Sequence, residues 1–395
     1  MAGSARQMRS YRGPAVLSAG FRPFFLAASI WAAVMAPLWV WVYTGKGRIP
    51  PGASLMWHGH EMLFGYLGGV IAGFLLTAIP NWTGRLPVTG TPLLLLFLSW
   101  LAGRAVMMTP WWTGWPGLLG DGLFLTVFAG VVGREVWIGK NWRNLPVAVM
   151  VGALALCNIA FHLGVREASI RLAAGVITTL ICLIGGRIIP SFTTNWLKKR
   201  GAETLPTPFN RFDLIMVSGT AAAMLVWALA PVAVPTGLLL CAVGVGHAIR
   251  LCRWRGGKVW GEALLWILHV GYAWVAAGLI LVGLASLTGA AGLGFSLPAA
   301  GCLHALTAGA MTVMSLAVMT RAILGHTGRE LHAGPGVTAL YVLANLAAVV
   351  RVAAALFPAA YVFGLTLSGY LWAGAFGLFL CLFGPKLVGP RLAKA

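Results

Sequence analysis

The chain has 395 residues, of which 59% are hydrophobic and only 9% are charged, and its mean hydropathy is +0.87. This composition excludes a soluble globular protein of the same length, because its surface would be too apolar for water. The formal charge of +20 would suit nucleic-acid binding only if a basic patch lay on a soluble face, and no segment is long enough to build one, so we expect a membrane protein without a nucleic-acid partner.

Apolar runs rich in leucine, alanine, valine and glycine follow one another along the chain, and most approach the roughly 20 residues that cross a bilayer as a helix. None shows the alternation of a membrane β-barrel, so the backbone must satisfy its hydrogen bonds within helices. We predict an all-α, polytopic membrane protein with about twelve transmembrane helices in a single domain over residues 1–395. The helices are expected near 22–43, 57–79, 92–108, 117–138, 145–165, 168–190, 212–230, 233–253, 261–285, 298–321, 336–357 and 360–383.

An even number of helices places both termini on one side of the membrane, and the basic residues indicate which side. If the N-terminus is cytoplasmic, most of the 28 Lys and Arg residues fall on the cytoplasmic side, as in the run 198–200. The outer side then keeps Lys46, Arg48, Arg104, Arg166, Arg171 and Arg351. This bias predicts that both termini are cytoplasmic and that the basic helix ends contact membrane lipids.

The cytoplasmic ends of the second, sixth and tenth predicted helices resemble one another, over residues 76–85, 186–196 and 319–329. Because these helices are four apart, three four-helix pseudo-repeats are one interpretation. The alternative is that all three ends share Pro, Trp, Thr and Arg for interfacial reasons.

Common catalytic templates are absent from the sequence. It contains no P-loop, HExxH or GxSxG motif, and its six cysteines are scattered singly, as expected for core packing rather than disulfides or thiolate ligands. Any chemistry must therefore use other side chains within the helices or their short loops.

Histidines inside a bilayer are functional candidates, because imidazole is the usual protein ligand of haem iron, copper and zinc. Four lie towards the outer ends of predicted helices and a fifth lies mid-helix. These are His58, His60, His162 and His304, with His269 as the fifth. His58 and His60 should face different ways on a helix, and Glu61 could orient one imidazole. A single histidine more often has a structural role, but four at one depth predict a metal site.

A second polar set lies at the predicted cytoplasmic helix ends. Arginine forks and amides there could bind haem propionates, nucleotide or lipid phosphate, whereas lipid-headgroup anchoring is the alternative. The set comprises Asn81, Trp82, Arg85, Arg187, Asn195, Arg321 and Arg329. His326, His332 and His247 are expected to be mostly solvated or interfacial.

Three segments carry a resemblance to a known family: WHGHEMLFGYLGGVIAGFLLTAIPNWTGR at 57–85, IGGRIIPSFTTNWL at 184–197 and HALTAGAMTVMSLAVMTRAILGHTGR at 304–329. They resemble the NnrS family, bacterial inner-membrane proteins linked to denitrification and the nitric oxide response. The resemblance implies twelve helices that contain haem, which we expect to be of the b type, with copper as a further cofactor. The matching positions are His58, His60, Glu61, His304 and His326.

A weaker resemblance links the chain to the large subunit of haem-copper oxidases, which have twelve helices and use histidines of helices 2 and 10 for haem. It implies that His58 or His60, with His304, would ligate the iron. We expect His162 and His269 to serve a second metal or a polar path. The predicted helix 212–230 has no histidine pair, so the usual copper partner site is missing.

The expected function is therefore a haem- and metal-binding role that senses, buffers or turns over nitric oxide or handles the metals that it damages, with quinol or another electron-transfer partner. A catalytic role would make the protein a haem-dependent redox enzyme acting on nitric oxide or a related nitrogen oxide. The alternatives are a transporter of metal, haem or a small anion, with polar groups at the midplane, and a purely structural role in which the histidines are dispensable.

Overall fold

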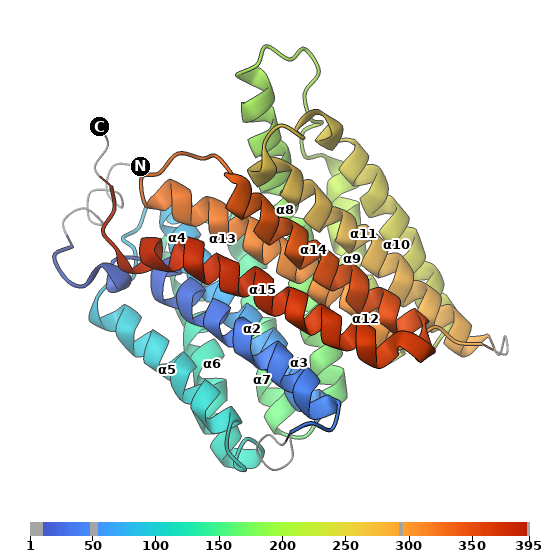
Figure 1. Ribbon diagram of the computed structural model, residues 1–395. Coiled ribbons are helices and arrows are strands. Elements are labelled where there is room, and N and C mark those ends of the chain that lie inside the picture. Colours follow the sequence, from blue (N-terminus) through green and yellow to red (C-terminus); the bar gives the residue numbers. More distant parts are fainter. Residues whose placement is uncertain (1–10, 48–53, 292–294, 393–395) are drawn as a thin grey trace. The chain divides into compact units, whose positions relative to one another are not determined.

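The computed structural model describes residues 11–47, 54–291 and 295–392, and the regular secondary structure of this part of the chain is helical throughout (Figure 1). It contains twelve helices, two of which are interrupted by a π-helical segment. The first six are α2 (Phe21–Tyr43), the composite of α3 (Leu55–His60), η2 (Glu61–Leu67) and α4 (Gly68–Thr83), α5 (Thr91–Met107), α6 (Gly114–Ile138), α7 (Leu145–His162) and α8 (Arg166–Lys198). The others are α9 (Arg211–Leu229), α10 (Val234–Cys252), α11 (Ala263–Ala290), the composite of α12 (Ala299–His304), η5 (Ala305–Met311) and α13 (Thr312–His326), α14 (Pro335–Leu356) and α15 (Tyr361–Val388).

Eleven of these helices are long and apolar enough to cross a membrane, and α5 is a shorter apolar helix of 17 residues. Their surfaces agree with a lipid environment. On α6, Leu119, Leu123 and Val127 form an exposed stripe at four-residue spacing, whereas the buried face carries Phe124 and Asp121. This arrangement reverses the pattern of a soluble helix, because lipid rather than water surrounds the bundle. The predicted all-α, polytopic membrane fold is confirmed; the cytoplasmic position of both termini and the pseudo-repeats stay predictions.

Several helices run further than their apolar sequences suggested. The predicted helix 168–190 extends from Arg166 to Lys198, and residues 80, 190 and 385 are prolines inside helices rather than at their ends. A proline removes one backbone donor but does not stop the next turn from forming. The predicted helix ends lie where the sequence becomes less hydrophobic, and the helices continue beyond them into more polar residues.

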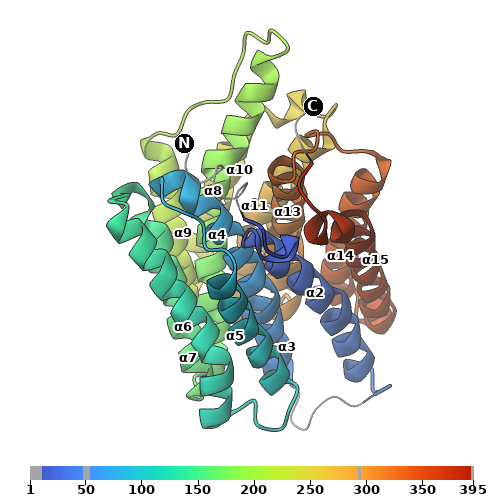
Figure 2. The same ribbon diagram turned by 90° about the vertical axis from the view of Figure 1, so that its left-hand side faces the viewer.

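The chain divides into two compact units. The first comprises residues 1–173, 322–329 and 376–395, and the second comprises 174–321 and 330–375. Within the first unit α2 packs on α4 and η2, while α5, α6 and α7 lie side by side (Figures 1 and 2). Within the second unit α9, α10 and α11 pack in sequence. The single transmembrane domain over the whole chain stays a prediction.

A π-helical segment, η2, shapes the centre of the first unit. It begins directly after His60, and it contains Gly65, whose carbonyl oxygen accepts a hydrogen bond from Trp100 Nε1 at 3.0 Å. A Cβ at Gly65 would lie 2.3 Å from Nη1 of Arg104, so only glycine leaves space for this guanidinium. Trp57 Nε1 donates to the carbonyl oxygen of Met107 at 2.8 Å. The widened helix is thus held against α5 at two points, and it admits a buried charge between them.

Candidate metal centre

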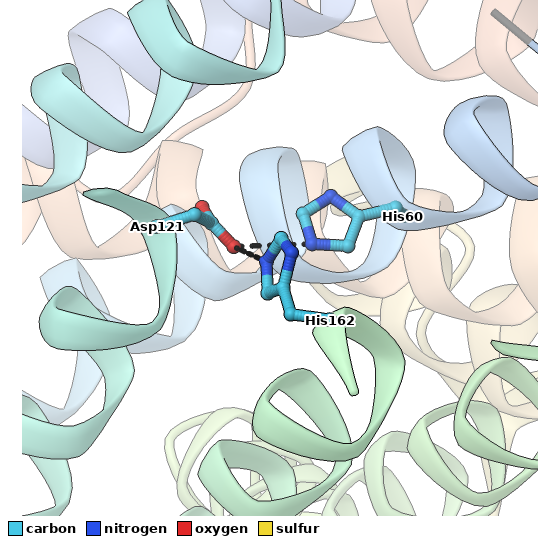
Figure 3. A group of neighbouring side chains, drawn as sticks. All are labelled: His60, Asp121 and His162. Atoms are coloured by element: carbon cyan, nitrogen blue, oxygen red, sulfur yellow. Dashed lines mark hydrogen bonds and ion pairs between the residues drawn. The ribbon is translucent and has the colours of Figure 1, made fainter. Parts of the chain in front are cut away.

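Three helices of the first unit bring His60, Asp121 and His162 together (Figure 3). Nε2 of His60 and Nε2 of His162 each lie 3.1 Å from Oδ2 of Asp121. The three side chains are buried, and one potential ligand atom from each lies within 4.8 Å of the other two. Two imidazoles and a carboxylate at this spacing could hold a metal ion.

The tautomers of both imidazoles follow from their outer contacts. Nδ1 of His60 lies 2.9 Å from Oε1 of Glu61, and Nδ1 of His162 lies 3.2 Å from the carbonyl oxygen of Trp112. An ionised carboxylate and a carbonyl can only accept, so each Nδ1 carries the hydrogen. In the neutral rings both Nε2 atoms then direct lone pairs at Asp121 Oδ2, which is also an acceptor. These three atoms repel one another unless a cation or protons lie between them.

Asn158, one turn before His162 on α7, completes this polar centre. Its Nδ2 donates to Asp121 Oδ2 at 2.7 Å and lies 3.5 Å from His60 Nε2, while its Oδ1 is buried without a hydrogen-bond partner. Rotation of the amide would turn Oδ1 towards the same point as the other three atoms. Oδ1 of Asn158 could therefore be an additional oxygen ligand of the metal ion.

Arg104 balances part of the negative charge. Its Nη1 lies 2.5 Å from Oε2 of Glu61, its Nη2 donates to Asp121, and Trp31 Nε1 also donates to Glu61 Oε2 at 2.8 Å. Two carboxylates and one guanidinium leave one net negative charge when both imidazoles are neutral. A buried net charge is unfavourable, so the cluster favours one further positive charge, which a metal ion or a proton on an imidazole would supply.

The cluster lies within the helices rather than in a loop. Asp121 is seven residues from the start of α6, or about 10 Å along its axis, and His162 is the last residue of α7. Trp112, in the connection between α5 and α6, is 4% exposed and supplies the carbonyl that holds His162. The short connection thus helps to close the site from solvent.

The other predicted metal ligands lie elsewhere. His58 is half-buried, and its ring stacks on Trp39 at a centroid distance of 5.2 Å. In the second unit, Nδ1 of His304 lies 2.5 Å from the carbonyl oxygen of Ala300. His269, also in the second unit, is 7% exposed, and its Nε2 lies 3.0 Å from the Thr193 hydroxyl.

The polar set at the predicted cytoplasmic ends has varied surroundings. Arg85 pairs with Glu135, and the Arg321 guanidinium carbon lies 4.0 Å from the Phe192 ring centroid. His326 lies beside the ring of Phe21. Of the remaining members, the exposed ones are Asn81 and Asn195, and the half-buried ones are Trp82, Arg187 and Arg329.

The expectation for His247 is wrong, and Arg104 is more buried than its place near a helix end suggested. The position of Arg104 on the outer side of the membrane stays a prediction, and its side chain is 2% exposed, because two carboxylates inside the unit compensate its charge. His247 was expected to be solvated or interfacial, but it is fully buried, with Nε2 2.7 Å from the Thr220 hydroxyl and Nδ1 2.8 Å from the Tyr272 hydroxyl. Local polar partners replace water around both side chains.

Sequence reasoning also missed Asp121 and Asn158. The signal for Asp121 was present, since it is an acid inside the apolar run 117–138, and the argument applied to histidines in the bilayer applies equally to a carboxylate. Asn158 gave no comparable signal, because an amide in a helix is common and uncharged.

Comparison with known proteins agrees with the resemblance in the sequence. None of the curated proteins searched matches the chain. The family described as NnrS protein matches residues 15–391. Nearly the whole chain is covered, and the protein therefore belongs to the NnrS family.

Proposed function

We propose that this protein binds a redox-active metal ion at His60, Asp121 and His162 and uses it in the nitric oxide response. The convergence of two Nε2 lone pairs on Asp121 Oδ2 supports the proposal most directly, because an ion at this point would remove the repulsion among three acceptors. Two imidazole nitrogens and one carboxylate oxygen suit the redox-active ions copper(II) and iron(II). Of these, copper agrees with the family resemblance.

The surrounding residues would prepare the ligands. Glu61 holds His60, and the Trp112 carbonyl holds His162, each in the tautomer that presents Nε2 to a metal. Arg104 pairs with Asp121 and orients this carboxylate. Burial excludes bulk water. A bound redox metal would supply a coordination position for a small ligand such as nitric oxide.

We propose haem as a second cofactor. The protein would lie in a bacterial inner membrane and receive electrons from quinol or another donor. The hydrogen bond between His304 Nδ1 and the Ala300 carbonyl puts the ring hydrogen on Nδ1, the tautomer in which Nε2 of His304 could bind haem iron. Within the first unit His58 is a candidate haem ligand, since His60 contacts Asp121. Arg85, Arg187 and Arg321 remain candidates for the propionates.

Metal analysis and an absorption spectrum of the detergent-purified protein test this function. We expect one metal ion per chain, lost in His162→Ala and retained in the control His332→Ala, whose ring is largely exposed and contacts Glu262. Wild-type protein that binds no metal after reconstitution would refute the metal site. The absence of a Soret band would refute haem binding but not the metal site. A transporter, the alternative function, would move the metal across the membrane of a vesicle.

A further inference from the structure

Basic side chains gather at the end of the first unit where α2 begins and α15 ends. Arg22 is only 3% exposed, and its Nη1 donates to the carbonyl oxygens of Leu387 at 2.8 Å and Gly389 at 2.6 Å. Lys386 donates to the carbonyl oxygen of Leu382. Both cations therefore use the carbonyl-rich C-terminal end of α15, where positive charge is favoured.

The segment after α15 adds a third cation to this end. The Leu392 amide donates to the Thr327 carbonyl oxygen at 3.0 Å, just after α13. Gly328 has φ +78°, and a Cβ there would lie 2.8 Å from the Leu392 oxygen and 3.6 Å from Arg391 Nε. The glycine permits this close approach, and the approach places the Arg391 side chain beside the turn that carries Arg329.

One cation at this end lacks a full set of hydrogen-bond partners. Nη1 of Arg329 is buried and has no hydrogen-bond partner. Together with Arg22, Lys386 and Arg391, Arg329 gives four formal positive charges around the start of α2 and the end of α15, and at least one guanidinium nitrogen is unsatisfied.

No acidic side chain of the first unit is left to balance them. The unit contains four acids, all engaged elsewhere in its described part: Glu61 and Asp121 pair with Arg104, Glu135 with Arg85, and Glu167 with Arg171. Glu330, which follows Arg329 in the chain, is exposed and begins a segment of the second unit. The four cations at this end therefore have no acidic partner among the described residues of the first unit.

We infer that this basic end binds a phosphate-type oxyanion, with Arg329 and Arg391 as its direct partners and Arg22 and Lys386 as supporting charge. Arginine guanidinium groups match the oxygens of phosphate. A phosphate dianion would balance the charges of Arg329 and Arg391, which do not donate to the α15 carbonyl oxygens. The phosphate can come from free inorganic phosphate or from an anionic lipid headgroup, since these residues lie at helix ends. The site is separate from the proposed metal centre.

Two measurements on the purified full-length protein distinguish these sources. Titration calorimetry with sodium phosphate, against sodium chloride at the same ionic strength, reports the free anion. Native mass spectrometry after exchange into phosphatidylglycerol or phosphatidylcholine reports the lipid. The variants are Arg329→Gln and Arg391→Gln, and the second lies beyond the last helix, where folding is least at risk. Arg134→Gln is the matched control, because the Arg134 side chain is 66% exposed.

We expect wild-type protein and Arg134→Gln to bind phosphate, or to retain phosphatidylglycerol in preference to phosphatidylcholine. Each site variant should weaken that binding at least about tenfold, the usual effect of one charge-assisted hydrogen bond. Metal content should not change in any variant. The inference is overturned if wild-type protein binds neither form of phosphate, or if Arg391→Gln and a folded Arg329→Gln bind as well as Arg134→Gln.

Discussion

Replacement of Asp121 by asparagine tests the proposed metal centre most sharply, because it keeps the shape of the side chain and removes its charge. Two unit charges about 4 Å apart near a protein interior interact by about 4 kcal/mol at an effective dielectric constant of 20. Arg104, which pairs with Asp121, offsets part of this attraction. We therefore expect metal binding to lose about 2.7 kcal/mol, equivalent to a dissociation constant about a hundredfold weaker.

Competition with a chromophoric chelator measures this change in Asp121→Asn, and thermal unfolding of the metal-free protein checks the fold. The metal-free melting temperature should change little, because Glu61 still pairs with Arg104 and the cluster loses its net negative charge. Glu135→Gln is the control, since Glu135 is 8% exposed and pairs with arginines rather than histidines. Wild-type affinity in Asp121→Asn would show that this carboxylate is not a ligand.

Three further substitutions test the surroundings of the site. Arg104→Gln leaves Glu61 and Asp121 buried without their counter-charge, so unfolding should become about 3–5 kcal/mol easier, and an unchanged melting temperature would contradict this account. Gly65→Ala places a Cβ 2.3 Å from Arg104 Nη1 and should destabilise the protein by about 1–3 kcal/mol in thermal unfolding, whereas Gly130→Ala, with open space around it, should not. His304→Ala should remove the haem absorption without unfolding the protein, and an unaltered spectrum would exclude His304 as a ligand.

Much of the fold could be predicted from the sequence because lipid imposes a simple rule on each segment. Every backbone group must be bonded within its own helix, so the apolar runs alone indicate where most helices lie. The rule fails at helix ends. For example, α8 continues past Pro190 to Lys198, because backbone hydrogen bonding does not depend on whether a side chain is apolar. The segments were therefore predictable, but their ends were not.

The centre of the cluster was harder to predict, because it depends on how helices rotate against one another. The spacing of His58 and His60 indicated only that their rings should face different ways, and their neighbours in the structure are Trp39 and Asp121. The ion pair between Arg104 and Asp121 joins α5 to α6, and no local sequence pattern in either helix predicts it. A buried ion pair appears in the sequence as two isolated charges, and a charge near a helix end resembles an interfacial anchor.

The two π-helical segments, one in each unit, share a pattern of residues. η2 begins after His60 and η5 begins after His304, and in both segments glycine lies five residues beyond the histidine. Gly65 leaves space for Arg104, and a Cβ at Gly309 would lie 2.6 Å from the ring of Trp274. π-helical segments inside α-helices occur frequently at functional sites. An internal repeat would produce this shared irregularity, and a histidine that opens such a segment is therefore a stronger ligand candidate than one placed by depth alone.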